Sequence, residues 1–138
     1  MDIMNTIFTK NKTNALGFAL DTLSEKNTQI TRNVANADTP YYRSKKLVFR
    51  EVMEEYFSQG KAKKLYVTHE KHIQPFKFPP DPKDFVRRQN NPSLRTDGND
   101  VNLDYEMSEQ AKSSILYTML TEITGGKFSS IKEAMRTR

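Results

Sequence analysis

Two groups of side chains in this sequence are of the types that bind metal ions, and the first is a histidine pair. His69 and His72 are three residues apart, with Glu70 between them. The zinc-protease motif places two histidines four residues apart on a helix, and no third ligand follows the pair here. The segment also has the composition of a strand or loop. The spacing therefore favours two surface histidines over a zinc site.

The second group is the acidic run D-G-N-D that begins at Asp97 and continues with Asn102 and Asp104. A calcium loop of the EF-hand type needs Gly at its sixth position and Glu at its twelfth. Counted from Asp97, Gly stands at the second position and Ser108 at the twelfth. The run is better explained as a turn that leads into a helix.

No other pattern in the chain indicates catalysis. There is no Gly-rich nucleotide loop and no G-x-S-x-G elbow. The chain contains no Cys, which excludes disulfides and thiolate metal sites. We therefore predict no catalytic residue, cofactor, metal or small-molecule substrate, and we interpret the protein as a non-enzyme; a small metal-dependent hydrolase using the histidine pair is the weaker alternative.

The composition indicates a thin core and a solvated surface. Of 138 residues, 36% are hydrophobic and 28% are charged, with a net charge of +5. The basic excess lies in the middle of the chain, where acids are interleaved with it, which disfavours a nucleic-acid surface and leaves an acidic partner as a minor option. No run approaches the roughly 18 apolar residues of a membrane span, and the start lacks the apolar stretch of a secretory signal.

The prolines divide the chain into three parts. All six lie between Pro40 and Pro92, and proline interrupts helices. We therefore predict a mainly α fold with an N-terminal helix in 1–38, a proline-rich, partly ordered centre in 39–100 and a C-terminal helix in 101–138. Within the centre, apolar spacing predicts a short helix at 48–57, a strand at 65–68 and an extended loop at 75–95.

The N-terminal part carries a heptad seam, in which apolar residues alternate at spacings of four and three as in a coiled coil. Its members are Leu16, Leu20, Leu23, Asn27, Ile30, Val34 and Ala37. Asn27 either specifies the register of a buried contact or faces water. Pro40 disfavours helical geometry at Thr39, so the helix must stop near Asp38.

The C-terminal part carries a wider apolar band on a helix that starts at about Leu103. The band residues that we expect to pack against the seam are Ile115, Leu116, Met119 and Ile123. Gly125 and Gly126 interrupt the pattern, but the apolar spacing resumes after them and favours a continuing or kinked helix. Two narrow stripes bury little area, so we hypothesise that both ends fold fully only on assembly.

Two motifs resemble those of the flagellar basal-body rod proteins, within the axial family of rod and hook subunits. The first is the turn motif Asn33, Ala35, Asn36, Asp38, Thr39, Pro40 and Tyr42, and the second is the helix-entry motif Asp97, Gly98, Asn99, Val101 and Glu106. A T-x-x-x-H stretch at Thr68 adds to the resemblance. Tyr41 departs from it, because the family usually has Gly there.

The resemblance implies a structural subunit of the proximal rod that assembles helically through its end helices. Members of the group are exported unfolded, without a cleaved signal peptide, to a periplasmic rod. The implied partners are copies of itself, the adaptor FliE, FlgC and other rod subunits, and the flagellar export gate, with no nucleic acid. Another rod subunit of the FlgC type, or a basic coiled-coil adaptor, remains as an alternative.

Overall fold

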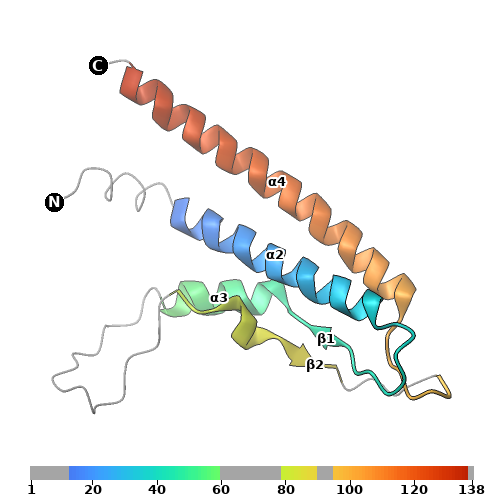
Figure 1. Cartoon of the computed structure of the whole chain (residues 1–138). Coiled ribbons are helices and arrows are strands. Elements are labelled where there is room, and N and C mark those ends of the chain that lie inside the picture. Colours follow the sequence, from blue (N-terminus) through green and yellow to red (C-terminus); the bar gives the residue numbers. More distant parts are fainter. Residues whose placement is uncertain (1–12, 60–78, 90–94, 137–138) are drawn as a thin grey trace, which may run out of the picture.

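The described part of the chain is elongated and mainly helical (Figure 1). The computed structural model describes residues 13–59, 79–89 and 95–136. Its elements, in chain order, are α2 (Thr13–Ala35), β1 (Lys45–Lys46), α3 (Phe49–Gln59), the 3-10 helix η1 (Pro82–Phe85), β2 (Arg87–Arg88) and α4 (Leu103–Arg136). The mainly α prediction is confirmed. The strand at 65–68 and the histidine pair lie outside the described residues.

The two long helices lie side by side and antiparallel, as Figure 1 shows. On α2, Leu23 is fully buried and Ile30 is 6% exposed, which fits the heptad spacing. On α4 the buried residues are Glu106 and Ser113, which are seven apart and so share one face. The prediction that the end helices pack together is therefore confirmed, although the buried residues of α4 are polar.

A second face of α2 is covered by the central segment. Phe18, Leu47 and Val52 form the buried apolar cluster. The Tyr56 ring of α3 stacks on Phe18 with ring centroids 4.5 Å apart. The short helix predicted at 48–57 is thus present as α3, and its apolar side explains why Phe18, which lies off the heptad seam, is buried.

The segment predicted to be an extended loop at 75–95 contains two short elements in its described part, η1 and β2. Asp81 Oδ1 accepts a hydrogen bond from Lys83 N, and Pro82 occupies the first turn of η1, as is common at helix starts. β2 then pairs antiparallel with β1. The prediction of an irregular loop was wrong there because a local cap and a non-local strand partner order the chain.

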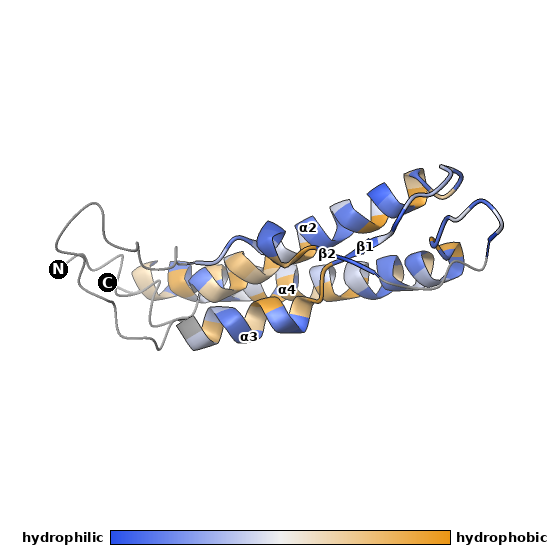
Figure 2. Cartoon of the chain, turned by 90° about the horizontal axis from the view of Figure 1, so that it is seen from below, coloured by the Kyte–Doolittle hydropathy of each residue, from blue (hydrophilic) through white to orange (hydrophobic). Residues whose placement is uncertain are grey.

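α4 runs without interruption for 34 residues, through Gly125 and Gly126. Apart from the adjoining helix backbone, no atom of the described residues lies within 4 Å of the position that a Cβ would take at either glycine, so close packing among these residues does not explain them. The helix therefore continues, as the resumed apolar spacing predicts. Figure 2 shows apolar residues recurring along the C-terminal half of α4.

Candidate functional site at the junction of the end helices

The end of α2 is a compact turn. The backbone N–H of Asn36 donates to Arg32 O and Asn33 O, and the N–H of Thr39 donates to Asn36 O at 3.1 Å. Pro40 has no N–H to continue the helix. The turn therefore exposes several carbonyl groups that need donors from elsewhere.

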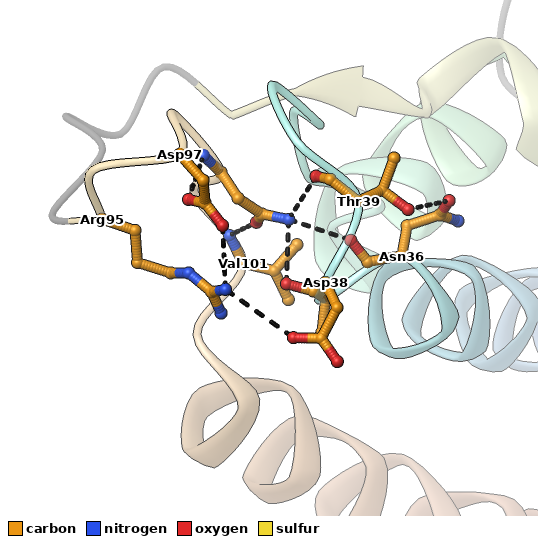
Figure 3. A network of polar contacts seen from close by, with 8 residues as sticks. Asn36, Asp38, Thr39, Arg95, Asp97 and Val101 are labelled. Atoms are coloured by element: carbon orange, nitrogen blue, oxygen red, sulfur yellow. Dashed lines mark hydrogen bonds and ion pairs between the residues drawn. The ribbon is translucent and has the colours of Figure 1, made fainter.

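The amide of Asn99 supplies those donors from the other end of the sequence. Its Nδ2 lies 2.9 Å from the carbonyl oxygens of Asn36, Ala37 and Thr39, and the side chain is 1% exposed (Figure 3). An amide has two N–H groups, so at least one is shared between two carbonyls. The Oδ1 atom accepts from Val101 N at 2.8 Å, which fixes the amide orientation.

An exposed ionic contact lies beside this amide. Arg95 lies 2.8 Å from Asp97 Oδ2 and 3.6 Å from Asp38 Oδ1. The N–H of Asn99 donates to Asp97 Oδ1, and this hydrogen bond lowers the pKa of the Asp97 carboxyl. Because these charges are exposed, we assign the stability of the junction to the buried amide and not to the ion pairs.

A second buried amide, that of Asn33, joins α2, β1 and α4. Its Nδ2 donates to Lys45 O at 2.8 Å and to Glu106 Oε1 at 2.9 Å. Its Oδ1 accepts from Lys45 N at 3.1 Å and from Tyr42 OH at 3.3 Å. Asn33 is 1% exposed, so all of its polar positions are satisfied inside the protein.

Two glutamates near the start of α4 have environments that shift their pKa values in opposite directions. Glu106 is 4% exposed, and its burial raises the pKa of its carboxyl. One turn further on, Glu109 accepts from Lys26 at 2.9 Å and from Lys112 at 2.9 Å. These hydrogen bonds lower the pKa of Glu109 to about 2. Burial thus disfavours the charged form of Glu106, whereas the two lysines stabilise the charged form of Glu109.

The loop after α2 and the loop before α4 each contain one residue with left-handed backbone. Tyr41 has φ 59° and Gly98 has φ 74°, and the N–H of Tyr41 donates to Asp97 O at 3.0 Å. A Cβ at Gly98 would lie 2.8 Å from Tyr41 Cδ1. The absence of a side chain at Gly98 therefore permits both its left-handed backbone angle and the close approach of the Tyr41 ring.

Comparison with known proteins places these contacts in a family. No family model matches the chain. The chain is 33% identical over 118 residues to the flagellar basal body rod protein FlgB of Bacillus subtilis (strain 168), covering 85% of this chain and 87% of the relative. The chain belongs to the FlgB family of flagellar basal body rod proteins. It is 29% identical to the FlgB of Borrelia hermsii, with 81% and 86% covered, and 27% identical to that of Escherichia coli (strain K12), with 86% and 88% covered.

The family assignment makes the chain a structural subunit of the flagellar rod, in preference to a basic coiled-coil adaptor or a FlgC-type subunit. None of the helices in residues 13–59, 79–89 and 95–136 is long and apolar enough to cross a bilayer. Those residues also hold no group of three or more acidic or histidine side chains arranged for a metal ion.

The structure brings the two FlgB-type motifs together. Asn33 of the turn motif bonds Glu106 of the helix-entry motif and is itself bonded by Tyr42 OH, while the backbone carbonyls of Asn36 and Thr39 accept from Asn99. Pro40, Ala35 and Asp38 are exposed around them, and Val101 is buried beneath. Sequence reasoning identified these residues as motif members without predicting their contacts.

The C-terminal band is placed differently from the prediction. Ile115, Leu116, Met119 and Ile123 are between 39% and 64% exposed, so they do not form a buried contact with the seam of the same chain. The seam residues Leu16, Leu20, Asn27 and Val34 are half-buried. The reason is that α4 turns Glu106 and Ser113 toward α2, where Asn33 and Lys26 hold its first turns. A role of the band in assembly stays a prediction.

Sequence reasoning missed the residues that bond across the junction outside the motifs. Lys26 and Glu109 are 83 residues apart and pair at 2.9 Å. Asp100 Oδ1 accepts from Ser44 N at 2.6 Å, across 56 residues. No local pattern marks either pair, because ordinary charged and polar residues acquire these partners only when the chain folds.

Proposed function

We propose that this rod subunit assembles helically in the proximal rod, with α4 as the main surface toward neighbouring subunits. The observation that carries the proposal is the exposed apolar content of α4, whose other face is already occupied by α2. Four exposed large apolar residues lie within about 100° of one another around this helix: Ile115 at 64%, Leu116 at 39%, Met119 at 52% and Ile123 at 45%. Contiguous apolar exposure of this kind is typical of interaction surfaces.

The length of α4 supports the same proposal. It has 34 residues, which span about 51 Å at 1.5 Å per residue. The junction at Asn33 and Asn99 fixes one end of α4, and the helix extends away from that fixed end (Figure 1). A contact that joins unlike surfaces of successive subunits generates a helix and not a closed ring.

The same proposal covers the neighbours of the subunit, its route to the rod and its lack of catalysis. The expected neighbours are other copies, the adaptor FliE, FlgC and other rod subunits, and the export gate. The subunit reaches the periplasmic rod without a cleaved signal peptide, its end helices become fully ordered there, and it has no enzymatic activity. These expectations rest on the motif resemblance and on the thin apolar core.

The test combines a deletion strain with single substitutions on α4. Loss of rods and motility in the deletion strain is expected, with rescue by the unaltered gene. Met119→Asp and Ile123→Asp should not rescue, because a charge in the apolar band opposes burial against a neighbour. Ser129→Asp adds the same charge at another exposed position of α4 and should rescue.

Circular dichroism of the purified variants separates assembly from folding, since the altered side chains are exposed and the helices should be retained. If rods form normally with both aspartate variants, the band has no role in assembly. If rods form normally in the deletion strain, the protein is not required for the rod.

A further inference from the structure

The two-stranded ribbon carries four cations in four residues. β1 is Lys45–Lys46 and β2 is Arg87–Arg88, and they pair antiparallel with Lys45 opposite Arg88 and Lys46 opposite Arg87. Residues that are directly opposite on paired strands share a face of the ribbon. Each face therefore presents two like charges at short range, which disfavours the pairing.

The register brings one of these pairs especially close. The N–H of Gln89 donates to Ser44 O at 2.9 Å, so Ser44 and Gln89 are a hydrogen-bonded pair. Such pairs alternate with non-hydrogen-bonded ones, in which the Cα atoms approach to about 4.5 Å. Lys45 and Arg88 occupy the next position and are therefore the close pair, with both side chains exposed.

Within the described residues, only one of the four cations has a side-chain hydrogen-bond partner, and that partner is a neutral hydroxyl. Lys46 Nζ donates to Tyr105 OH at 2.7 Å, and this hydrogen bond raises the pKa of Lys46. Lys45, Arg87 and Arg88 form no ion pair with any described residue. Of the 17 acidic residues in the sequence, only Asp2 and Glu70 lie outside the described part. The chain thus has few further acids with which to balance the ribbon.

The two edges of the ribbon differ. The outer edge of β1 is occupied, because the Asn33 amide bonds both Lys45 N and Lys45 O, as a neighbouring strand would. The outward backbone groups of Arg88 in β2 bond to no described residue. An edge strand with unpaired N–H and C=O groups can accept another extended chain. Like charge repels a second copy of this ribbon, so an acidic chain is selected.

We propose that the ribbon is a docking surface for an acidic, extended protein segment that lies along the open edge of β2. Side chains of an extended segment alternate in direction with the same period as the ribbon, so acids at alternate positions can reach one face of it. A flat anionic membrane would meet one face only. Residues 43–46 and 87–89 themselves contain no aromatic side chain on which a nucleic-acid base could stack, and the neighbouring Tyr105 ring is already in contact with Lys46.

The binding test uses the full chain and a fluorescent dodecapeptide of alternating glutamate and threonine. The triple variant Lys45→Gln, Arg87→Gln, Arg88→Gln is compared with a matched control that removes three exposed cations of α4, Lys127→Gln, Lys132→Gln, Arg136→Gln. We expect the ribbon variant to bind the peptide about tenfold more weakly and the control to bind it as the unaltered protein does. Added salt should weaken binding to the unaltered protein.

Two further measurements make the result decisive. The midpoint of thermal unfolding should rise in the ribbon variant, because like charges are removed from a strand pair, so weaker binding would not reflect misfolding. Anionic phosphatidylserine vesicles and single-stranded DNA should bind without dependence on the ribbon cations. Equal loss in both triple variants, absence of peptide binding, or ribbon-dependent binding of vesicles or DNA alone would overturn the proposal.

Discussion

Asn33 Nδ2 lies 2.9 Å from Glu106 Oε1, a contact that crosses 73 residues of sequence and joins the end of α2 to the first turn of α4. The same amide bonds both backbone groups of Lys45 and thereby joins the ribbon to the two helices. Together with Asn99, it makes the junction the fixed point from which α4 extends. The stability of this junction can be measured directly.

Asn99→Ala should be among the most damaging single substitutions in the described chain. It leaves three carbonyls of the α2 turn without their donor in a buried place, at an expected cost of about 2–4 kcal/mol in the free energy of unfolding. Urea unfolding followed by circular dichroism measures this cost.

Asn102→Ala is the matched control for Asn99→Ala. Asn102 Oδ1 accepts from Tyr105 N and so caps the start of α4, but it bonds no residue of α2. Its loss should cost about 1 kcal/mol. If Asn102→Ala were as damaging as Asn99→Ala, the turn carbonyls would not depend on the Asn99 amide.

Stability should fall as the pH rises above the ordinary carboxyl value of 4.5, because of Glu106. Its folded-state pKa is raised by burial, so the folded chain holds a proton that the unfolded chain has already released. The stabilisation is complete below the unfolded value and is lost as the pH rises through the folded one. Urea midpoints between about pH 4.5 and about pH 8 should show the decline, and Glu106→Gln should remove it.

The carboxylate of Glu109 should change stability with pH in the opposite direction to Glu106, and Glu109→Gln tests this. The folded-state pKa of Glu109 is lowered from 4.5 to about 2, so its pairing with Lys26 stabilises the fold above the unfolded value and is lost as the pH falls toward about 2. The variant should lose about 1–2 kcal/mol at neutral pH and still show the decline caused by Glu106. Disappearance of that decline in Glu109→Gln would refute its assignment to Glu106.

Gly98→Ala should destabilise the tip of the junction for two separable reasons. Left-handed backbone costs a non-glycine residue about 1–2 kcal/mol, and the added Cβ would meet the Tyr41 ring at 2.8 Å. In a Tyr41→Gly background the second cost disappears and the first remains. A double-mutant cycle by urea unfolding should therefore give a smaller penalty in that background. Equal penalties in both backgrounds would show that the ring yields without cost.

Gly125→Ala and Gly126→Ala should each stabilise α4. Both glycines lie inside the helix with open space at the Cβ position, and Ala is favoured over Gly in helices by about 1 kcal/mol. The expected result is higher helicity by circular dichroism and a higher thermal midpoint. A lower midpoint in either variant would show that α4 bends or packs there in a way that requires Gly.

The sequence by itself determined the features that depend on local spacing. Heptad spacing and the position of Pro40 predicted a helix that α2 realises and a stop in the following turn, and the run from Asp97 predicted the entry to α4. These features follow from the helical period and from the missing N–H of proline, which act within a few residues. The two family motifs were likewise readable as strings of residues.

Only the tertiary structure decided which residues meet. The band containing Ile115 and Met119 was expected against α2, but Glu106 and Ser113 occupy that face, because Asn33 and Lys26 bond the first turns of α4 and so set its rotation. The pairing of Lys45 with Arg88 is equally invisible in the sequence. Such contacts depend on groups tens of residues apart, and periodicity carries no information about which distant partner a side chain will find.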